Sequence, residues 1–158
     1  MALAVLITGF SQCKQKDGGG SFSVEVSYTN ADKLTPMANR KMLLEEIPFG
    51  PDANPVILDS GSVTAAAGSL VLNGKAKEAG LYQLSVEGGP VLVLVNDADK
   101  IDLSVDLSKH EKFYTVKGSA GSAHLQEFID QYSSRSIEVN KVFAQLDSLK
   151  NVNAGDSL

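Results

Sequence analysis

Residues that commonly carry chemistry are scarce in this chain, which has one cysteine and two histidines in 158 residues. A single cysteine, Cys13, cannot form an internal disulfide, a C-x-x-C redox pair or a cysteine-rich zinc site. The histidines, His110 and His124, lie fourteen residues apart and match no helical two-histidine metal motif. The sequence therefore predicts no metal site, no cofactor and no thiol chemistry within this chain.

Positive charge is also in deficit, because 14 Lys and Arg oppose 19 Asp and Glu for a formal net charge of −5. No extended basic surface is available to neutralise phosphates, so nucleic acid is not expected as a partner. The G-x-S-x-G elbow of serine hydrolases is absent. A hydrolase would therefore need His110 or His124 in a pocket with a serine and a carboxylate, without any local signature. We expect the chain not to be an enzyme.

No hydrophobic run is long enough to cross a bilayer, which takes roughly 20 residues. Residues 2–10 form a shorter apolar run that ends in small residues and is followed by Cys13 and a polar, glycine-rich stretch. This arrangement resembles the signal of bacterial lipoproteins, in which the cysteine carries the lipid. It implies a signal remnant over residues 1–13, lipidation at Cys13, a flexible tether over 14–21 and a location in the cell envelope. The alternative is a buried N-terminal strand with a free core cysteine.

From residue 22 onward hydrophobic and polar residues alternate, the pattern of strands with one buried face. Glycine, proline and asparagine turns separate the strands, and Asn73-Gly74 is a strong turn signal. Residues 91–95, apolar at every position, predict a central strand covered on both faces. Residues 40–47 are also compatible with a helix. Strands are expected over residues 22–29, 40–47, 56–66, 69–75, 81–87, 91–95, 101–107 and 113–117. The 22–118 segment is therefore predicted to be an antiparallel β-sandwich or open barrel of about eight strands, making the chain mainly β.

The period then changes to three and four, which predicts an amphipathic helix over residues 122 to about 150, within a helical segment 119–151, with Ser122 as a possible cap. Residues 152–158 are expected to be a tail at which the chain looks truncated. A helix this long, near 43 Å at 1.5 Å per residue, cannot be wholly buried on so small a domain. Part of it should meet a second subunit or a further domain. The residues expected to form this interaction face are Leu125, Phe128, Tyr132, Val139, Val142, Leu146 and Leu149.

Three stretches carry a family resemblance: "ILDSGSVTAAAGSLVLNGKAKEAGLYQLSV", "VLVLVNDADKIDLSVDLS" and "YTVKGSAGSAHLQEFI". They resemble the β-rich domain of unknown function that precedes a thioredoxin-like domain in many envelope lipoproteins of Gram-negative bacteria. The resemblance covers about residues 56–130 and includes a turn at Asp59-Ser60. Its other matching positions are Gly68, Gly80-Leu81-Tyr82, Asn96-Asp97 and Gly118-Ser119.

The resemblance implies a non-catalytic interaction and spacer domain that positions a thiol-disulfide oxidoreductase. The C-x-x-C domain that follows the helix in such proteins is not within these 158 residues. Expected partners are a thioredoxin-like domain or a second subunit through the helix, and a membrane through the lipid anchor, facing the periplasm or the outer surface. The alternative is a stand-alone ligand-binding or adhesin-like envelope domain that self-associates through its helix.

Overall fold

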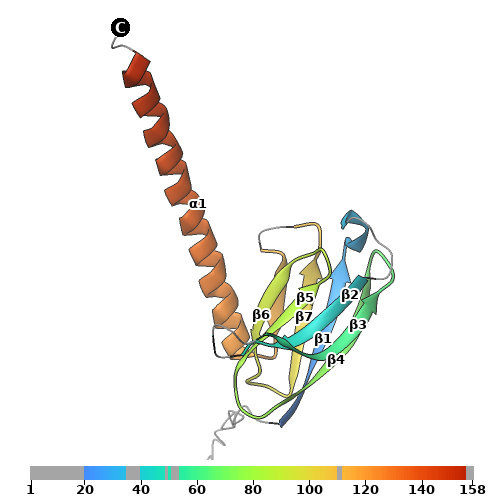
Figure 1. The fold of residues 1–158 in the computed structure, drawn as a ribbon. Helices are drawn as coiled ribbons and strands as arrows, with labels where there is room; N and C mark the ends of the chain where they lie inside the picture. The colour runs from blue at the N-terminus through green and yellow to red at the C-terminus, as the bar shows by residue number, and fades with distance from the viewer. Residues whose placement is uncertain (1–19, 35–39, 49, 51–53, 110–111, 156–158) are drawn as a thin grey trace, which may run out of the picture.

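Eight strands form two packed sheets, and one long helix follows them (Figure 1). The computed structural model describes residues 20–34, 40–48, 50, 54–109 and 112–155, with helix side chains described through Ser148. The strands are β1 (Gly20–Thr29), β2 (Arg40–Glu46), β3 (Val56–Val63), β4 (Gly68–Ala76), β5 (Leu81–Val86), β6 (Val91–Val95), β7 (Lys100–Asp106) and β8 (Tyr114–Lys117). A short 3-10 turn, η1, spans Ala31–Lys33, and α1 spans Ala120–Gly155. The predicted mainly β sandwich with a C-terminal helix is confirmed.

The sheets have the strand orders β4-β1-β7-β8 and β3-β2-β5-β6. All pairs are antiparallel except β1 with β7, which run parallel with Val24 opposite Ile101. The prediction of a purely antiparallel fold is therefore wrong for one pair. Strands β1 and β7 are far apart in the sequence, and alternation within each strand carries no information about the direction of its neighbour. Segment 40–47 is a strand, because β2 pairs with both β3 and β5.

The core lies between the two sheets and consists of the alternating hydrophobic side chains that the sequence predicts. On β1 these are Phe22, Val24, Val26 and Tyr28, none more than 4% exposed. The Phe22 ring meets the Tyr82 ring of β5 edge to face, with centroids 5.0 Å apart. Because β1 and β5 belong to different sheets, this contact joins the two layers.

Two predicted turns lie inside strands. Asn73-Gly74 belongs to β4, where Gly74 pairs with Phe22. A Cβ atom at Gly74 would lie 2.4 Å from the Phe22 ring, so the glycine admits a ring and does not form a turn. Asp59 lies within β3, and its carboxylate accepts the amides of Ser60 and Asn73, each at 2.8 Å. Asp59 therefore links β3 to β4.

The prediction that residues 91–95 form a central strand is wrong, because β6 is at the edge of its sheet. Leu92 and Leu94 point into the core, whereas Val91 is 54% exposed. The residues of β6 that do not point into the core are also apolar because α1 packs against this strand. A Cβ atom at Gly121 would lie 3.1 Å from Val95, so the first helical turn covers one end of this strand.

The domain boundaries also differ at both ends. Strand β1 begins at Gly20, where Gly20 and Ser21 pair with Ala76 and Lys75, so the sandwich begins two residues earlier than predicted. Helix α1 continues to Gly155, into the segment predicted to be a tail. Cys13 lies outside the described residues.

Candidate functional site

Two side chains, those of Ser119 and Asp97, accept backbone amides from the first turn of α1. Ser119 is the N-cap: its hydroxyl accepts the Ser122 amide at 2.9 Å, as serine does at many helix starts. Asp97, from the turn after β6, accepts the Gly121 amide at 2.7 Å and brings a negative charge to the positive end of the helix dipole. The prediction that Ser122 is the cap is therefore wrong. The helix begins two residues earlier, at Ala120.

Ser122 instead joins the helix to the edge of the second sheet. Its hydroxyl oxygen accepts the Val95 amide at 2.9 Å. The Val95 carbonyl lies 3.1 Å from the Ser122 hydroxyl and 3.2 Å from that of Ser119. Two serine hydroxyls thus replace the neighbouring strand that β6 lacks on this side. Both serines are buried, so the start of α1 is held firmly against the sandwich.

A second attachment joins the next turn of α1 to β8. Gln126 donates a side-chain hydrogen bond to the Tyr114 carbonyl at 2.7 Å. The Tyr114 side chain is only 5% exposed, and its hydroxyl has no hydrogen-bond partner within the described residues. Burial, with a smaller contribution from the Asp130 charge, raises the pKa of Tyr114 to about 12. The base of the helix therefore rests on a buried ring that stays neutral.

Beyond this base the helix projects away from the sandwich (Figure 1). From Gln131 to Ser148 every side chain except Ser136 is exposed. Of the predicted interaction face, Leu125 is half-buried at the base, and Leu149 falls in the part of α1 whose side chains are not described. The exposed members are Phe128 at 65%, Tyr132 at 67%, Val139 at 52%, Val142 at 55% and Leu146 at 47%. We call these residues, with Leu125 and Leu149, the apolar stripe.

Two further hydrophobic side chains of α1 are exposed, Phe143 at 61% and Ile137 at 37%. Phe143 lies four residues after Val139, the spacing that also separates Phe128 from Tyr132. The sequence alone therefore indicates that Phe143 belongs with the stripe. The rings of Phe128 and Tyr132 stack with centroids 6.4 Å apart. The free part of α1 therefore presents a large apolar surface to solvent.

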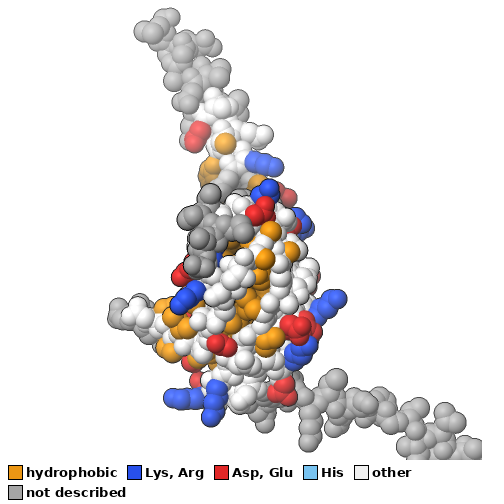
Figure 2. Space-filling view, turned by 90° about the vertical axis from the view of Figure 1, so that its right-hand side faces the viewer, with side chains coloured by type: hydrophobic (Ala, Val, Ile, Leu, Met, Phe, Trp, Pro, Cys, Tyr) orange, Lys and Arg blue, Asp and Glu red, His pale blue; other side chains and the backbone are white. Residues whose placement is uncertain are grey.

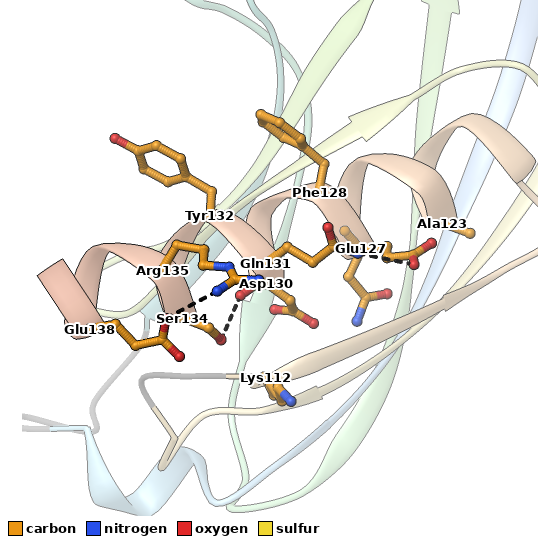
Figure 3. Close-up of a pocket in the computed structure, with 11 residues that line it drawn as sticks. Lys112, Ala123, Glu127, Phe128, Asp130, Gln131, Tyr132, Ser134, Arg135 and Glu138 are labelled. Atoms are coloured by element: carbon orange, nitrogen blue, oxygen red, sulfur yellow. Dashed lines mark hydrogen bonds and ion pairs between the residues drawn. The ribbon is translucent and has the colours of Figure 1, made fainter.

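A groove of about 830 Å³, lined by both polar and apolar side chains, lies beneath the base of α1. Lys112 lies on the sandwich side, and α1 contributes charged groups that include Asp130, Arg135 and Glu138. Figure 3 shows Phe128 and Tyr132 leaving the helix on the side away from Lys112. The ion pair of Arg135 and Glu138, at 3.3 Å, is exposed and contributes little to stability. Phe128 and Tyr132 also line this groove, so the apolar stripe borders it.

A smaller apolar surface lies on the edge strands β3 and β4. Val56 and Ile57 on β3 and Val71 on β4 are each more than half exposed. Figure 2 shows hydrophobic side chains gathered in a strip across the face that lies to the right in Figure 1. The apolar stripe of α1 is the larger surface, because it contains aromatic rings and extends over several turns.

The structure describes one of the two histidines, His124. His124 is exposed on α1 and does not line the groove beneath the helix, and His110 lies outside the described residues. Among the described residues, no group of three or more His, Cys, Asp or Glu side chains is arranged to hold a metal ion. Within the same part of the chain, no helix combines the length and the apolar character needed to span a membrane.

No family model matches the sequence, and no curated protein matches it.

Proposed function

We propose that this chain is the non-catalytic interaction and spacer domain of an envelope lipoprotein, tethered through Cys13, whose helix holds a thioredoxin-like domain away from the membrane. One observation carries the proposal: among the described residues α1 contacts the sandwich at its base, and the stripe residues Phe128, Tyr132, Val139, Val142 and Leu146 are exposed. A helix that served only the core of the sandwich would bury this stripe.

The attachment supports a spacer because it fixes the direction of the helix. The hydrogen bonds of Ser119, Ser122 and Asp97 restrain the first turn, and a continuous helix transmits that direction along its length. At 1.5 Å per residue, 36 helical residues extend about 54 Å, more than the width of the sandwich. A domain at the far end of α1 is thus held at a defined distance.

The relative position of the two ends supports the same role. Strand β1 begins at the end of the sandwich where α1 also begins, and α1 then runs past the opposite end (Figure 1). A lipid tether that precedes β1 and a domain that follows α1 would lie on opposite sides of the sandwich. The sandwich itself then acts as the rigid body between membrane and partner.

The shifted titrations of the sandwich have structural causes. Hydrogen bonds from Asn30 and then Ser108 hold the pKa of Asp106 below its ordinary value of 3.8. A hydrogen bond to Glu25 and then one to Asp102 raise the pKa of Lys100. These groups brace loops and neighbouring strands on the surface. They have the features of fold maintenance and not those of acid–base catalysis.

The proposal is tested in a Gram-negative host that expresses the gene with an alkyne fatty-acid probe. We expect the protein to be labelled and to sediment with membranes. Cys13→Ser should lose both the label and the membrane association, whereas Ser11→Ala should retain them. An unlabelled wild-type protein in the membrane-free fraction would contradict the anchor.

The non-catalytic part of the proposal is tested separately by an insulin-reduction assay on the 158-residue chain. We expect no turnover, because the chain has one cysteine and a dithiol mechanism needs two. Turnover that survives Cys13→Ser would contradict the non-catalytic assignment.

A further inference from the structure

The apolar stripe of α1 repeats every seven residues. One set of positions, at intervals of seven, holds Leu125, Tyr132, Val139 and Leu146. A second set, three residues later in each repeat, holds Phe128, Arg135, Val142 and Leu149. These are the a and d positions of a heptad pattern, and only Arg135 departs from an apolar residue.

A strict heptad seam indicates that the occupant of the stripe is another helix. A straight helix has 3.6 residues per turn, so a seven-residue repeat drifts by about 20° in each heptad unless two helices wind around each other. A sheet surface is covered instead by a broader stripe that follows the 3.6 period. Within the described residues, α1 is the one helix of more than a single turn. A second copy of the chain would supply a helix with the matching seam.

The exposed area is large enough for a stable pair. The rings of Phe128, Tyr132 and Phe143 are 65%, 67% and 61% exposed. With roughly 150–250 Å² for each buried aromatic side chain, the three rings alone leave on the order of 300–500 Å² in solvent. The aliphatic residues of the stripe bring each copy toward the roughly 800 Å² per partner of a standard stable interface. Monomeric proteins rarely expose a continuous apolar surface of this size.

Arg135 indicates the direction of the second helix. In a parallel pair, equivalent d positions face each other, so the two Arg135 side chains would meet within the seam and repel. In an antiparallel pair, a positions face d positions. Arg135 then faces Val139 of the second copy and lies beside that copy's Glu138. The two Glu138 side chains are neighbours at the centre of the antiparallel pair, with one Arg135 on either side of them, so that two charges of each sign lie close together.

The residues that flank the seam agree with this direction. Ile129 and Phe143 occupy the same flanking heptad position, four residues after Leu125 and Val139. In the antiparallel register Ile129 lies beside Phe143 of the second copy, whereas a parallel pair places Phe143 beside Glu138. Tyr132 then faces Val142, and Phe128 faces Leu146. Apart from the two layers in which Arg135 faces Val139, the facing seam positions are apolar in both copies.

We propose that α1 pairs with α1 of a second copy as an antiparallel coiled coil centred near Ile137. This pairing goes beyond the spacer role, because it would place a domain that follows α1 beside the sandwich of the second copy and the two tethers at opposite ends of the pair. The first turns of both helices stay attached to their own sandwiches. The two sandwiches therefore lie at opposite ends of the pair. The side of the helix from which Phe128 and Tyr132 project, which borders the groove at Lys112, is the side that the second helix occupies (Figure 3).

The oligomeric state of the full chain is measured by sedimentation equilibrium. We expect twice the chain mass of 16.7 kDa. Val139→Asp places an unpaired charge in the seam and should raise the dissociation constant at least roughly 100-fold. The matched control is Asn140→Asp, which adds the same charge to an exposed residue outside the seam and should leave the dimer intact. A monomeric wild type, or a dimer that is unchanged by Val139→Asp, would overturn the proposal.

The direction is measured by disulfide trapping in a Cys13→Ser background. Variants Tyr132→Cys and Val142→Cys are oxidised separately and as a mixture. The antiparallel register predicts a mixed disulfide between the two variants and no disulfide between identical chains. Disulfides between identical chains would overturn the antiparallel arrangement. Circular dichroism of each variant checks that the sandwich and helix remain folded, so that loss of trapping reports on pairing.

Discussion

The Ser122 hydroxyl oxygen accepts the backbone amide of Val95 at 2.9 Å and so joins the first turn of α1 to the edge of the second sheet. This hydrogen bond has two structural consequences. It ends the sheet at β6 without another strand, and it fixes the start of a helix that projects from the sandwich beyond its second attachment, at Gln126. An open strand edge invites pairing with other chains, and the two serines occupy the Val95 end of that edge.

Ser122→Ala should loosen the base of α1, because it leaves the Val95 amide without its partner next to a buried helix turn. The expected loss of unfolding free energy is about 1 to 3 kcal/mol, measured by urea denaturation. Ser133→Ala, an exposed position on the same helix, serves as the control and should change the stability little. Equal effects of the two substitutions would show that Ser122 does not anchor the helix.

Gly74→Ala should destabilise the sandwich, because the new methyl group would lie 2.4 Å from the Phe22 ring. Overpacking of this kind has a typical effect of roughly 1 to 3 kcal/mol, measured from the urea midpoint. Phe22→Leu removes the ring, so Gly74→Ala should be less harmful in that background. Full additivity of the two substitutions would contradict the proposed close approach.

Tyr114→Phe should leave the unfolding free energy unchanged or raise it by about 1 kcal/mol, because the buried hydroxyl has no partner within the described residues and its removal abolishes a desolvation penalty. The measurement is thermal and urea unfolding at neutral pH. A loss of more than this amount would indicate that the hydroxyl has a stabilising interaction.

The same tyrosine gives a pH dependence. Its pKa is about 12 in the folded chain against an ordinary 10.0, so between these values the unfolded chain releases a proton that the folded chain retains. The raised pKa of Tyr114 therefore does not lower the free energy of unfolding below pH 10, and this free energy falls as the pH rises toward 12. Unfolding curves in this range should show a smaller decline for Tyr114→Phe than for wild type.

Arg135→Glu should weaken self-association about tenfold, because four glutamates would then lie at the centre of the antiparallel pair. The double variant Arg135→Glu with Glu138→Arg restores two charges of each sign and should recover most of the affinity. The dissociation constants are measured by sedimentation equilibrium. Failure of the double variant to recover would contradict the central charge arrangement.

The sequence contained the strands and the helix, because alternation and helical periodicity are local properties of the chain. The parallel pairing of β1 with β7 was not predictable in this way, since it is decided by the stacking of two sheets. Asn73-Gly74 has the composition of a hairpin turn. The Phe22 ring lies where a side chain at Gly74 would be, and the two residues form part of β4. Likewise, the continuous apolar residues of β6 indicate a covered strand, and they do not reveal that the cover is the first turn of α1.

The apolar stripe was predictable as a set of residues, and the length of the helix indicated that part of it would be exposed; which part is exposed was not predictable. Spacing places Val139 and Leu146 on one side of the helix whether that side faces a sheet or solvent. Only the position of the base, set by Ser119 and Ser122 against Val95, shows that the stripe points away from the sandwich. The interaction surface therefore follows from one local hydrogen-bonding arrangement acting on a helix predicted from its period.

The most direct test of the account is amide hydrogen exchange of residues 131–148 in the wild-type chain and in Val139→Asp. We expect protection in the wild type and its loss in the variant, because this part of α1 has no support from the sandwich once the second helix is gone. Protection of β1 and β5 should be the same in both. Equal protection of the helix in the two proteins would show that it is held by its own domain and would contradict the account.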